Sequence, residues 1–185
     1  MKKIKNLCES DFLKLFFAFF TVACLVAAVF MPDRAQIFPG FVKILTGTCK
    51  ISTNYFALGG YAATYLNMGL VGLICTLLCF LPGAKPNQVT TLGVLLTVGF
   101  GSWGINILNI WPTILGVALH CVVKGEKLGS RTNAMLFTTG LAPFISELME
   151  EFMSDVAEIS AQEQGTAVSV LTYNAAKSQI TQNEQ

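Results

Sequence analysis

The sequence predicts an all-α, multi-pass helical membrane protein with one broken or re-entrant element. Of its 185 residues, 53% are hydrophobic and only 12% are charged, roughly half the charged fraction of a typical globular domain. Between Ile51 and Val123 the only charged residue is Lys85. A stretch of that length would expose large apolar patches if it folded in water, so much of the surface is expected to face lipid.

The first predicted span covers residues 15–31. This run, LFFAFFTVACLVAAVFM, carries no charge and has the length of a membrane helix. Basic residues precede it, as in a signal peptide, but no small-residue cleavage site follows and further spans come later. We therefore predict a retained first helix, which Pro32, Pro39 and Gly40 end. The mixed stretch from Ile37 to Leu58 is either an interfacial helix or a segment that dips into the membrane beside other helices.

The next predicted span covers residues 61–81, YAATYLNMGLVGLICTLLCFL. It has the length of a membrane helix, and Pro82 and Gly83 follow it. Asn67 is its notable polar residue, since a carboxamide at membrane depth needs hydrogen-bond partners that lipid does not supply. Small residues, which let helices approach closely in lipid, gather in its N-terminal half: Ala62, Ala63, Gly69 and Gly72.

Residues 90–123 differ from the other spans, because two short apolar pieces flank a polar break. The pieces run from Thr91 to Val98 and from Ile114 to Val123. The break from Gly99 to Pro112 begins with three glycines in six residues. Glycine frees the backbone and proline removes a donor, and such backbone survives at membrane depth only inside protein or along a wet cavity. We therefore predict a discontinuous or re-entrant element.

A last, weaker span is predicted for residues 132–149, broken by Gly140 and Pro143. Beyond it the composition becomes polar and acidic, and no apolar run is long enough to cross a membrane. Residues 150–185 are accordingly predicted to be a solvated tail. The membrane domain is expected to cover residues 1–149.

The distribution of lysine and arginine favours the re-entrant form of residues 90–123. Cytoplasmic loops of membrane proteins carry an excess of these residues. If the element crosses the membrane once, five of them lie inside and six outside, whereas a hairpin gives eight inside and three outside. We therefore predict a protein of the cell membrane whose N-terminus and Lys124–Arg131 loop are both cytoplasmic.

Polar residues in and near the break are the candidate solute path, because transporters place binding sites at broken helices. Asn54 and His120 are secondary candidates, the first as a further carboxamide and the second as the only histidine. The alternative interpretation is hydrogen bonding between helices for the asparagines, and a structural or interfacial role for the histidine. The main candidates are Asn67, Gly101, Gly104, Asn106 and Asn109.

The sequence contains no convincing motif for catalysis, metal binding, nucleic-acid binding or nucleotide binding. No Ser-His-Asp set, HExxH, carboxylate pair or P-loop occurs, so we expect no enzyme and no cofactor. The six cysteines form no CxxC pair, so neither a metal site nor a disulfide framework is expected. No basic stripe with interleaved aromatics points to nucleic acid. Gly99, Gly101 and Gly104 match a dinucleotide fingerprint, but their flanks are membrane-like rather than a strand and an amphipathic helix.

Three segments carry a recognisable combination of motifs: LTGTCKISTNYFALGGYAATYLNMGLVGL (45–73), FGSWGINILNIWPTILGV (100–117) and GLAPFISE (140–147). Together they resemble a bacterial membrane family, the domain-of-unknown-function family numbered 1576, over roughly residues 10–149. The resemblance implies a multi-pass membrane protein without an assigned activity. Members continue with further spans where this chain turns polar at Glu150, so the likeness is to the first half only and we expect a truncated or split copy. The Gly-Gly-Tyr to Leu-Val-Gly-Leu segment also resembles helices of urea channels, which pass a small neutral solute.

The resulting functional hypothesis is a transporter or channel component for a small solute. The alternative is a non-transporting membrane scaffold or a remnant subunit. The expected partners are the lipid bilayer and either a second copy of the chain or a missing second half. No nucleic-acid partner is expected.

Overall fold

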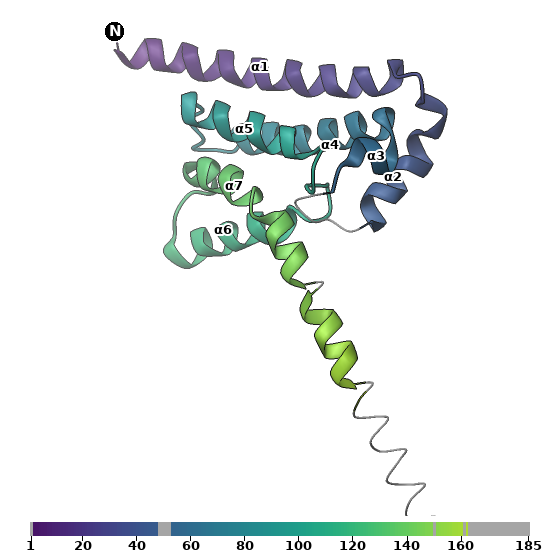
Figure 1. The fold of residues 1–185 in the computed structure, drawn as a ribbon. Helices are drawn as coiled ribbons and strands as arrows, with labels where there is room; N and C mark the ends of the chain where they lie inside the picture. The colour runs from purple at the N-terminus through teal and green to yellow at the C-terminus, as the bar shows by residue number, and fades with distance from the viewer. Residues whose placement is uncertain (1, 48–52, 150, 161, 163–185) are drawn as a thin grey trace, which may run out of the picture. The chain divides into compact units, whose positions relative to one another are not determined.

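The computed structural model describes residues 2–47, 53–149, 151–160 and 162, with side chains from Glu9 onward. The chain divides into two compact units, Met1–Glu147 and Leu148–Gln185. Across the described ranges the structure is helical apart from turns and one isolated bridge between Asn54 and Trp103. The elements labelled in Figure 1, with two short 3-10 helices, are α1 (Lys2–Phe30), η1 (Arg34–Gln36), α2 (Ile37–Thr46), α3 (Tyr55–Gly59), α4 (Tyr61–Cys79), α5 (Gln88–Phe100), α6 (Trp111–Lys124), η2 (Leu128–Arg131) and α7 (Thr132–Thr139).

Helices α1 and α4 pack tightly along each other, because small residues line their contact. A Cβ atom at Gly69 of α4 would lie 2.5 Å from Cδ2 of Leu25 in α1, so a glycine is required there. Within the same interface, the hydroxyls of Thr21 and Thr76 form a buried hydrogen bond of 3.0 Å. The prediction that small residues of this span bring helices together is confirmed at this pair.

The two long helices run antiparallel, which distinguishes the two ends of the first unit. At one end, the Lys14 ammonium lies 5.8 Å from the centre of the Phe80 ring, just past α4. At the other end, the Asp33 carboxylate accepts a hydrogen bond of 3.0 Å from the Ala62 amide in the first turn of α4. These ends are called the Lys14 end and the Asp33 end below.

Helices α2 and α3 lie against the N-terminal part of α4, near the Asp33 end. They meet through glycine backbones, since any side chain at Gly40 would overlap the carbonyl oxygen of Gly59. The sequence predicts that Pro39 helps to end the first helix, but it lies in the first turn of α2. Backbone N–H groups in the first turn of a helix have no acceptor within the helix, so a proline there costs no hydrogen bond. The mixed stretch from Ile37 to Leu58 therefore contains the two short helices α2 and α3. Residues 48–52 between these helices lie outside the described residues.

Helices α5 and α6 flank the break, which is shorter than predicted. α5 starts with a capping box, in which the Asn87 side chain accepts from the Thr90 amide at 3.1 Å and the Thr90 hydroxyl accepts from the Asn87 amide at 3.0 Å. Gly99 is still part of α5, and Pro112 lies in the first turn of α6. Pro112 therefore starts a helix rather than breaking one, which leaves residues 101–110 as the non-helical connection.

Both ends of this helix–break–helix element lie at the Lys14 end of the unit. Gly129, a few residues beyond α6, packs against the loop that precedes α5. A Cβ atom at Gly129 would lie 2.5 Å from the Ala84 amide nitrogen and 2.7 Å from the Pro82 carbonyl oxygen. That loop directly follows Phe80, whose ring contacts Lys14. The chain thus enters and leaves the element from the same side.

The helix boundaries differ from the predicted spans at both ends of residues 1–149. α1 continues as a helix through the polar residues back to Lys2. Residues 132–149 are two helical pieces rather than one span, because α7 ends at Thr139 and a second helix starts at residue 142 with Pro143 in its first turn. In the part of the chain that is described, two helices are long and apolar enough to cross a membrane, Glu9–Phe30 and Tyr61–Cys79.

The core of the first unit is formed by side chains from α1, α4, α5, α6, α7 and the break. Among the described side chains of these helices, the cysteines Cys24, Cys75, Cys79 and Cys121 are buried and unpaired, as expected of small packing residues. Fully or almost fully buried members of the core are Phe17, Val71, Val94, Val98, Ile105, Ile110, Met135 and Leu136.

The second unit begins with an exposed helix rather than with irregular polar chain. Residues 148–149 and 151–160 are helical, and every described side chain there is exposed. Large apolar residues recur along it at helical spacing: Leu148, Phe152, Val156 and Ile159. The predicted polar tail therefore contains an amphipathic helix, which the sequence hides because no continuous apolar run marks it.

Candidate functional site

The candidate site is the break itself, residues 101–110. The Ser102 carbonyl accepts a hydrogen bond of 3.1 Å from the Tyr55 amide, which ties the break to α3. The Ser102 hydroxyl donates to the Gly99 carbonyl at 2.7 Å. Gly104 adopts a φ of +72°, a left-handed conformation that glycine alone accepts without strain. The break is thus an ordered turn built on specific residues.

Asn67 of α4 holds the break in place from the centre of the unit. Its Nδ2 donates two hydrogen bonds, to the Gly101 carbonyl at 2.7 Å and to the Ile105 carbonyl at 2.8 Å. The side chain is fully buried, and its Oδ1 has no hydrogen-bond partner within the described part of the protein. A buried, unpartnered carboxamide oxygen costs about 1–3 kcal/mol, so it is a natural acceptor for a donor from water or a solute.

Asn106 and Asn109 fold the rest of the break through reciprocal hydrogen bonds. The Asn106 Oδ1 accepts from the Leu108 amide at 2.8 Å and from the Asn109 amide at 3.0 Å. The Asn109 Oδ1 accepts from the Asn106 amide at 2.9 Å, while its Nδ2 donates to the Gly104 carbonyl at 2.7 Å. These two carboxamides replace the bonds that a helix would have made, which is a structural role.

The two secondary candidates have different positions. Asn54 caps α3, since its Oδ1 accepts from the Phe56 amide at 3.0 Å, and its backbone pairs with Trp103 in the break. His120 is exposed near the C-terminal end of α6. The structure therefore brings together Asn67, Gly101, Gly104, Asn106 and Asn109, with Asn54 beside them and His120 elsewhere.

Two residues that contact the site were missed by sequence reasoning. The Ile44 carbonyl of α2 accepts from Asn106 Nδ2 at 3.3 Å, and the Ser146 hydroxyl accepts from Asn109 Nδ2 at 3.4 Å. A backbone carbonyl leaves no trace in a sequence. Ser146 does have a sequence signal, because it follows the apolar residues from Leu141 to Ile145 and its polar side chain needs a hydrogen-bond partner.

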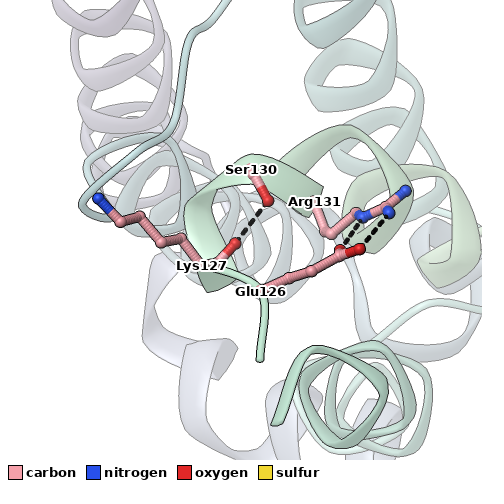
Figure 2. Close-up of polar contacts among 4 residues, drawn as sticks. All are labelled: Glu126, Lys127, Ser130 and Arg131. Carbon is pink, nitrogen blue, oxygen red and sulfur yellow. Dashed lines mark hydrogen bonds and ion pairs between the residues drawn. The ribbon is translucent and has the colours of Figure 1, made fainter. Parts of the chain in front are cut away.

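A second polar cluster lies at the Lys14 end, in the loop after α6. Arg131 binds Glu126 through two hydrogen bonds of 2.6 and 2.8 Å, and these bonds hold the pKa of the Glu126 carboxyl below its usual value. The Ser130 hydroxyl donates to the Lys127 carbonyl at 2.7 Å. Figure 2 shows the Lys127 side chain extending away from the Glu126–Arg131 pair. Its charge is therefore not neutralised by Glu126.

Two motifs from the sequence can be compared with the structure, a metal-ligand cluster and the dinucleotide fingerprint. No group of three or more His, Cys, Asp or Glu side chains gathers among them as a metal site. Of the glycines that match the dinucleotide fingerprint, Gly99 lies in the last turn of helix α5, and Gly101 and Gly104 follow that helix rather than a strand. The fingerprint therefore lacks its structural context.

Comparison with known proteins identifies one family. The family model described as "Protein of unknown function (DUF1576)" matches residues 33–180 of the chain. The match includes the break and extends into the second unit. No curated protein and no solved structure matches the sequence.

Proposed function

Because the chain belongs to the DUF1576 family of proteins of unknown function, we propose a function for it from its geometry. It is an integral protein of the cell membrane, and its broken helix forms part of a path for a small neutral solute. The observation that carries the proposal is the buried Oδ1 of Asn67 beside the break, which has no hydrogen-bond partner among the described residues. The role is non-enzymatic, and the solute moves without a covalent step.

The outward faces of the helices support a lipid environment. Large apolar side chains are exposed along the two long helices and along α6, and contiguous apolar surface of this extent would drive a protein to aggregate in water. In a bilayer the same side chains face hydrocarbon. Examples are Phe12, Phe19, Val26 and Phe30 of α1, Leu73 and Leu77 of α4, and Leu115, Leu119 and Val122 of α6.

The positions of the charges support a re-entrant hairpin with its loops in the cytoplasm. Lys14 and the loops that carry Lys85 and Lys127 lie at one end of the unit, where α5 begins and α6 ends. Arg34 follows α1 at the opposite end, and Lys43 lies on α2. The excess of positive charge at the Lys14 end makes that end the cytoplasmic one.

The chemistry of the break favours a neutral solute with N–H or O–H donors. Residues 101–110 contain no ionisable side chain, so they do not balance the charge of an ion at membrane depth. The open hydrogen-bonding position is an acceptor, the Asn67 Oδ1. A small amide or polyol could satisfy that oxygen while it passes the break.

The second candidate function is a non-transporting membrane scaffold. It is favoured by Asn106 and Asn109, whose carboxamides are engaged with the break and its neighbours. In that case the break only shapes the packing of α5 and α6 against α4, and an ordered water occupies the position at Asn67.

A flux assay on reconstituted protein distinguishes the two candidates. The full chain is incorporated into liposomes, and the entry of urea, acetamide and glycerol is compared with protein-free liposomes. The transport proposal predicts that at least one solute enters faster with protein. If none of the three does, the proposed solute class is wrong and the scaffold becomes the better account.

A pair of variants ties the flux to the break. Asn67→Ala removes the open acceptor and is expected to reduce flux per folded molecule about fivefold, the equivalent of one hydrogen bond. Thr76→Val is the matched control, because it removes a buried polar bond of the same helix away from the break. Folded protein is counted by size-exclusion chromatography. Equal flux from both variants would remove Asn67 from the solute path.

A further inference from the structure

A polar pocket of about 270 Å³ lies outside the break, at the Lys14 end of the first unit. It opens between the loop that precedes α5 and the turn that precedes α7. Pockets for drug-sized ligands measure about 300–1,000 Å³, so this one suits a small ligand. The side chains that line it are Lys85, Asn87 and Thr90 on one side, and Ser130, Thr132 and Asn133 on the other.

The two walls are held together by glycines. Gly129 approaches the Leu81 and Pro82 carbonyls so closely that a Cβ atom would lie 2.9 and 2.7 Å from their oxygens. Gly83 has a φ of +96°, and its open side faces the aliphatic part of Lys127, at 3.6 Å from a Cβ position. The pocket is therefore defined by close backbone packing rather than by a loose gap between loops.

Hydrogen bonding within the pocket leaves the Asn133 carboxamide as a donor, while the Ser130 and Thr132 hydroxyls donate to backbone carbonyls and keep acceptor oxygens. The Thr90 hydroxyl donates to the Asn133 Oδ1 at 2.7 Å, which leaves the Asn133 Nδ2 as a donor. The Asn87 Oδ1 accepts from the Val89 and Thr90 amides at 2.9 and 3.1 Å. Lys85 adds an ammonium, and no carboxylate lines the pocket. A cation would find no counter-charge there, whereas an anion would find one.

The part of the chain that surrounds the pocket also carries a net positive charge. From Leu81 to Arg131 the chain carries four cationic side chains, Lys85, Lys124, Lys127 and Arg131, and one carboxylate, Glu126. That carboxylate is bound by Arg131 (Figure 2). Among the described side chains, none forms an ion pair with Lys85 or Lys127.

We propose that this pocket binds a phosphate-type anion, with Lys85 as the charge partner and Asn133 as the amide donor. The anion is either free phosphate or the headgroup of an anionic phospholipid, because both present the same oxygens to an ammonium and an amide. The site is separate from the break, so this proposal does not rest on the solute path.

The test uses the full chain, purified in a neutral detergent. Binding of radiolabelled inorganic phosphate is measured by equilibrium dialysis. Retention of phosphatidylglycerol against phosphatidylcholine is measured in parallel by native mass spectrometry. Saturable binding of phosphate identifies a soluble ligand, and selective retention of phosphatidylglycerol alone identifies a lipid headgroup. If neither probe binds, the proposal is wrong.

Two variants and a control assign the binding to the pocket. Lys85→Gln is expected to weaken the binding about tenfold or more, as the loss of a charge-assisted bond implies. Asn133→Asp keeps the oxygen that Thr90 binds but adds a negative charge, and it is expected to abolish binding. Lys124→Gln changes an exposed lysine of the same end that does not line the pocket, and should alter affinity less than twofold. Equal losses from Lys85→Gln and Lys124→Gln would mean non-specific attraction and would overturn the proposal.

Discussion

Three asparagines make the break possible, and each uses its carboxamide differently. Asn106 and Asn109 bond to each other and to neighbouring backbone, so they replace helix bonds within the turn. Asn67 reaches across from α4 to two carbonyls of the break. Of these three carboxamide oxygens, the Asn67 Oδ1 is the one without a hydrogen-bond partner in the described part of the chain. All three carboxamides therefore hold the break, and the proposed function assigns a ligand only to the Asn67 oxygen.

The structural role of Asn106 predicts a loss of stability on truncation. Asn106→Ala leaves the Leu108 and Asn109 amides without their acceptor, which should cost about 1–3 kcal/mol. The measurement is the unfolding midpoint in detergent, followed by circular dichroism. Gln88→Ala removes an exposed amide at the start of α5 and should change stability by about 0.5 kcal/mol or less. Equal midpoints for the two variants would show that Asn106 does not hold the turn.

The sequence predicts which residues meet at the break but not which atoms bond. Glycines and carboxamides inside an apolar stretch indicate a broken helix, and the structure brings Asn67, Gly101, Gly104, Asn106 and Asn109 together. The partners include backbone carbonyls of Gly101, Ile105 and Ile44, which have no sequence signal. A carboxamide can donate or accept, so its role depends on geometry that spacing alone does not define.

At the scale of elements, the contact between α1 and α4 depends on glycine. Gly69→Ala would bring a Cβ atom within 2.7 Å of Leu25 Cγ and 3.2 Å of its backbone nitrogen. Overpacking of this kind costs about 1–3 kcal/mol. The expected result is a lower unfolding midpoint in detergent.

Gly116→Ala is the matched control for that prediction, because no described atom outside its neighbouring residues and its own helix backbone lies within 4 Å of its Cβ position on α6. Alanine is a better helix former than glycine by about 0.5–1 kcal/mol. This variant should therefore be as stable as the natural chain or slightly more so. If Gly69→Ala behaves in the same way, α1 and α4 do not pack as described.

Element boundaries show where hydropathy is informative and where it is not. The apolar run that ends at Met31 matches the C-terminal end of α1, and the run from Tyr61 to Leu81 matches the course of α4. Hydropathy did not reveal that α1 extends back to Lys2, because polar residues also form helix. It also merged α7 with the helix after it, since Gly140 and Pro143 interrupt the backbone without reducing the apolar content.

For the first unit as a whole, we propose that α5 and α6 form a hairpin that enters and leaves the membrane on one side. The packing of Gly129 against Pro82 and Ala84 brings the two loops together. Charge counting from the sequence favours the same topology. These arguments are independent, because the first uses backbone contacts and the second uses only the number of cationic residues.

Cysteine accessibility tests this claim most directly. Single cysteines are placed at Lys85, Lys127 and Lys43 in a version whose six natural cysteines are replaced, and intact cells are treated with a membrane-impermeant thiol reagent. The account predicts labelling at position 43 from outside, and labelling at positions 85 and 127 only after the membrane is permeabilised. Labelling of position 127 but not position 85 in intact cells would mean that residues 90–123 cross the membrane once, which would contradict the hairpin.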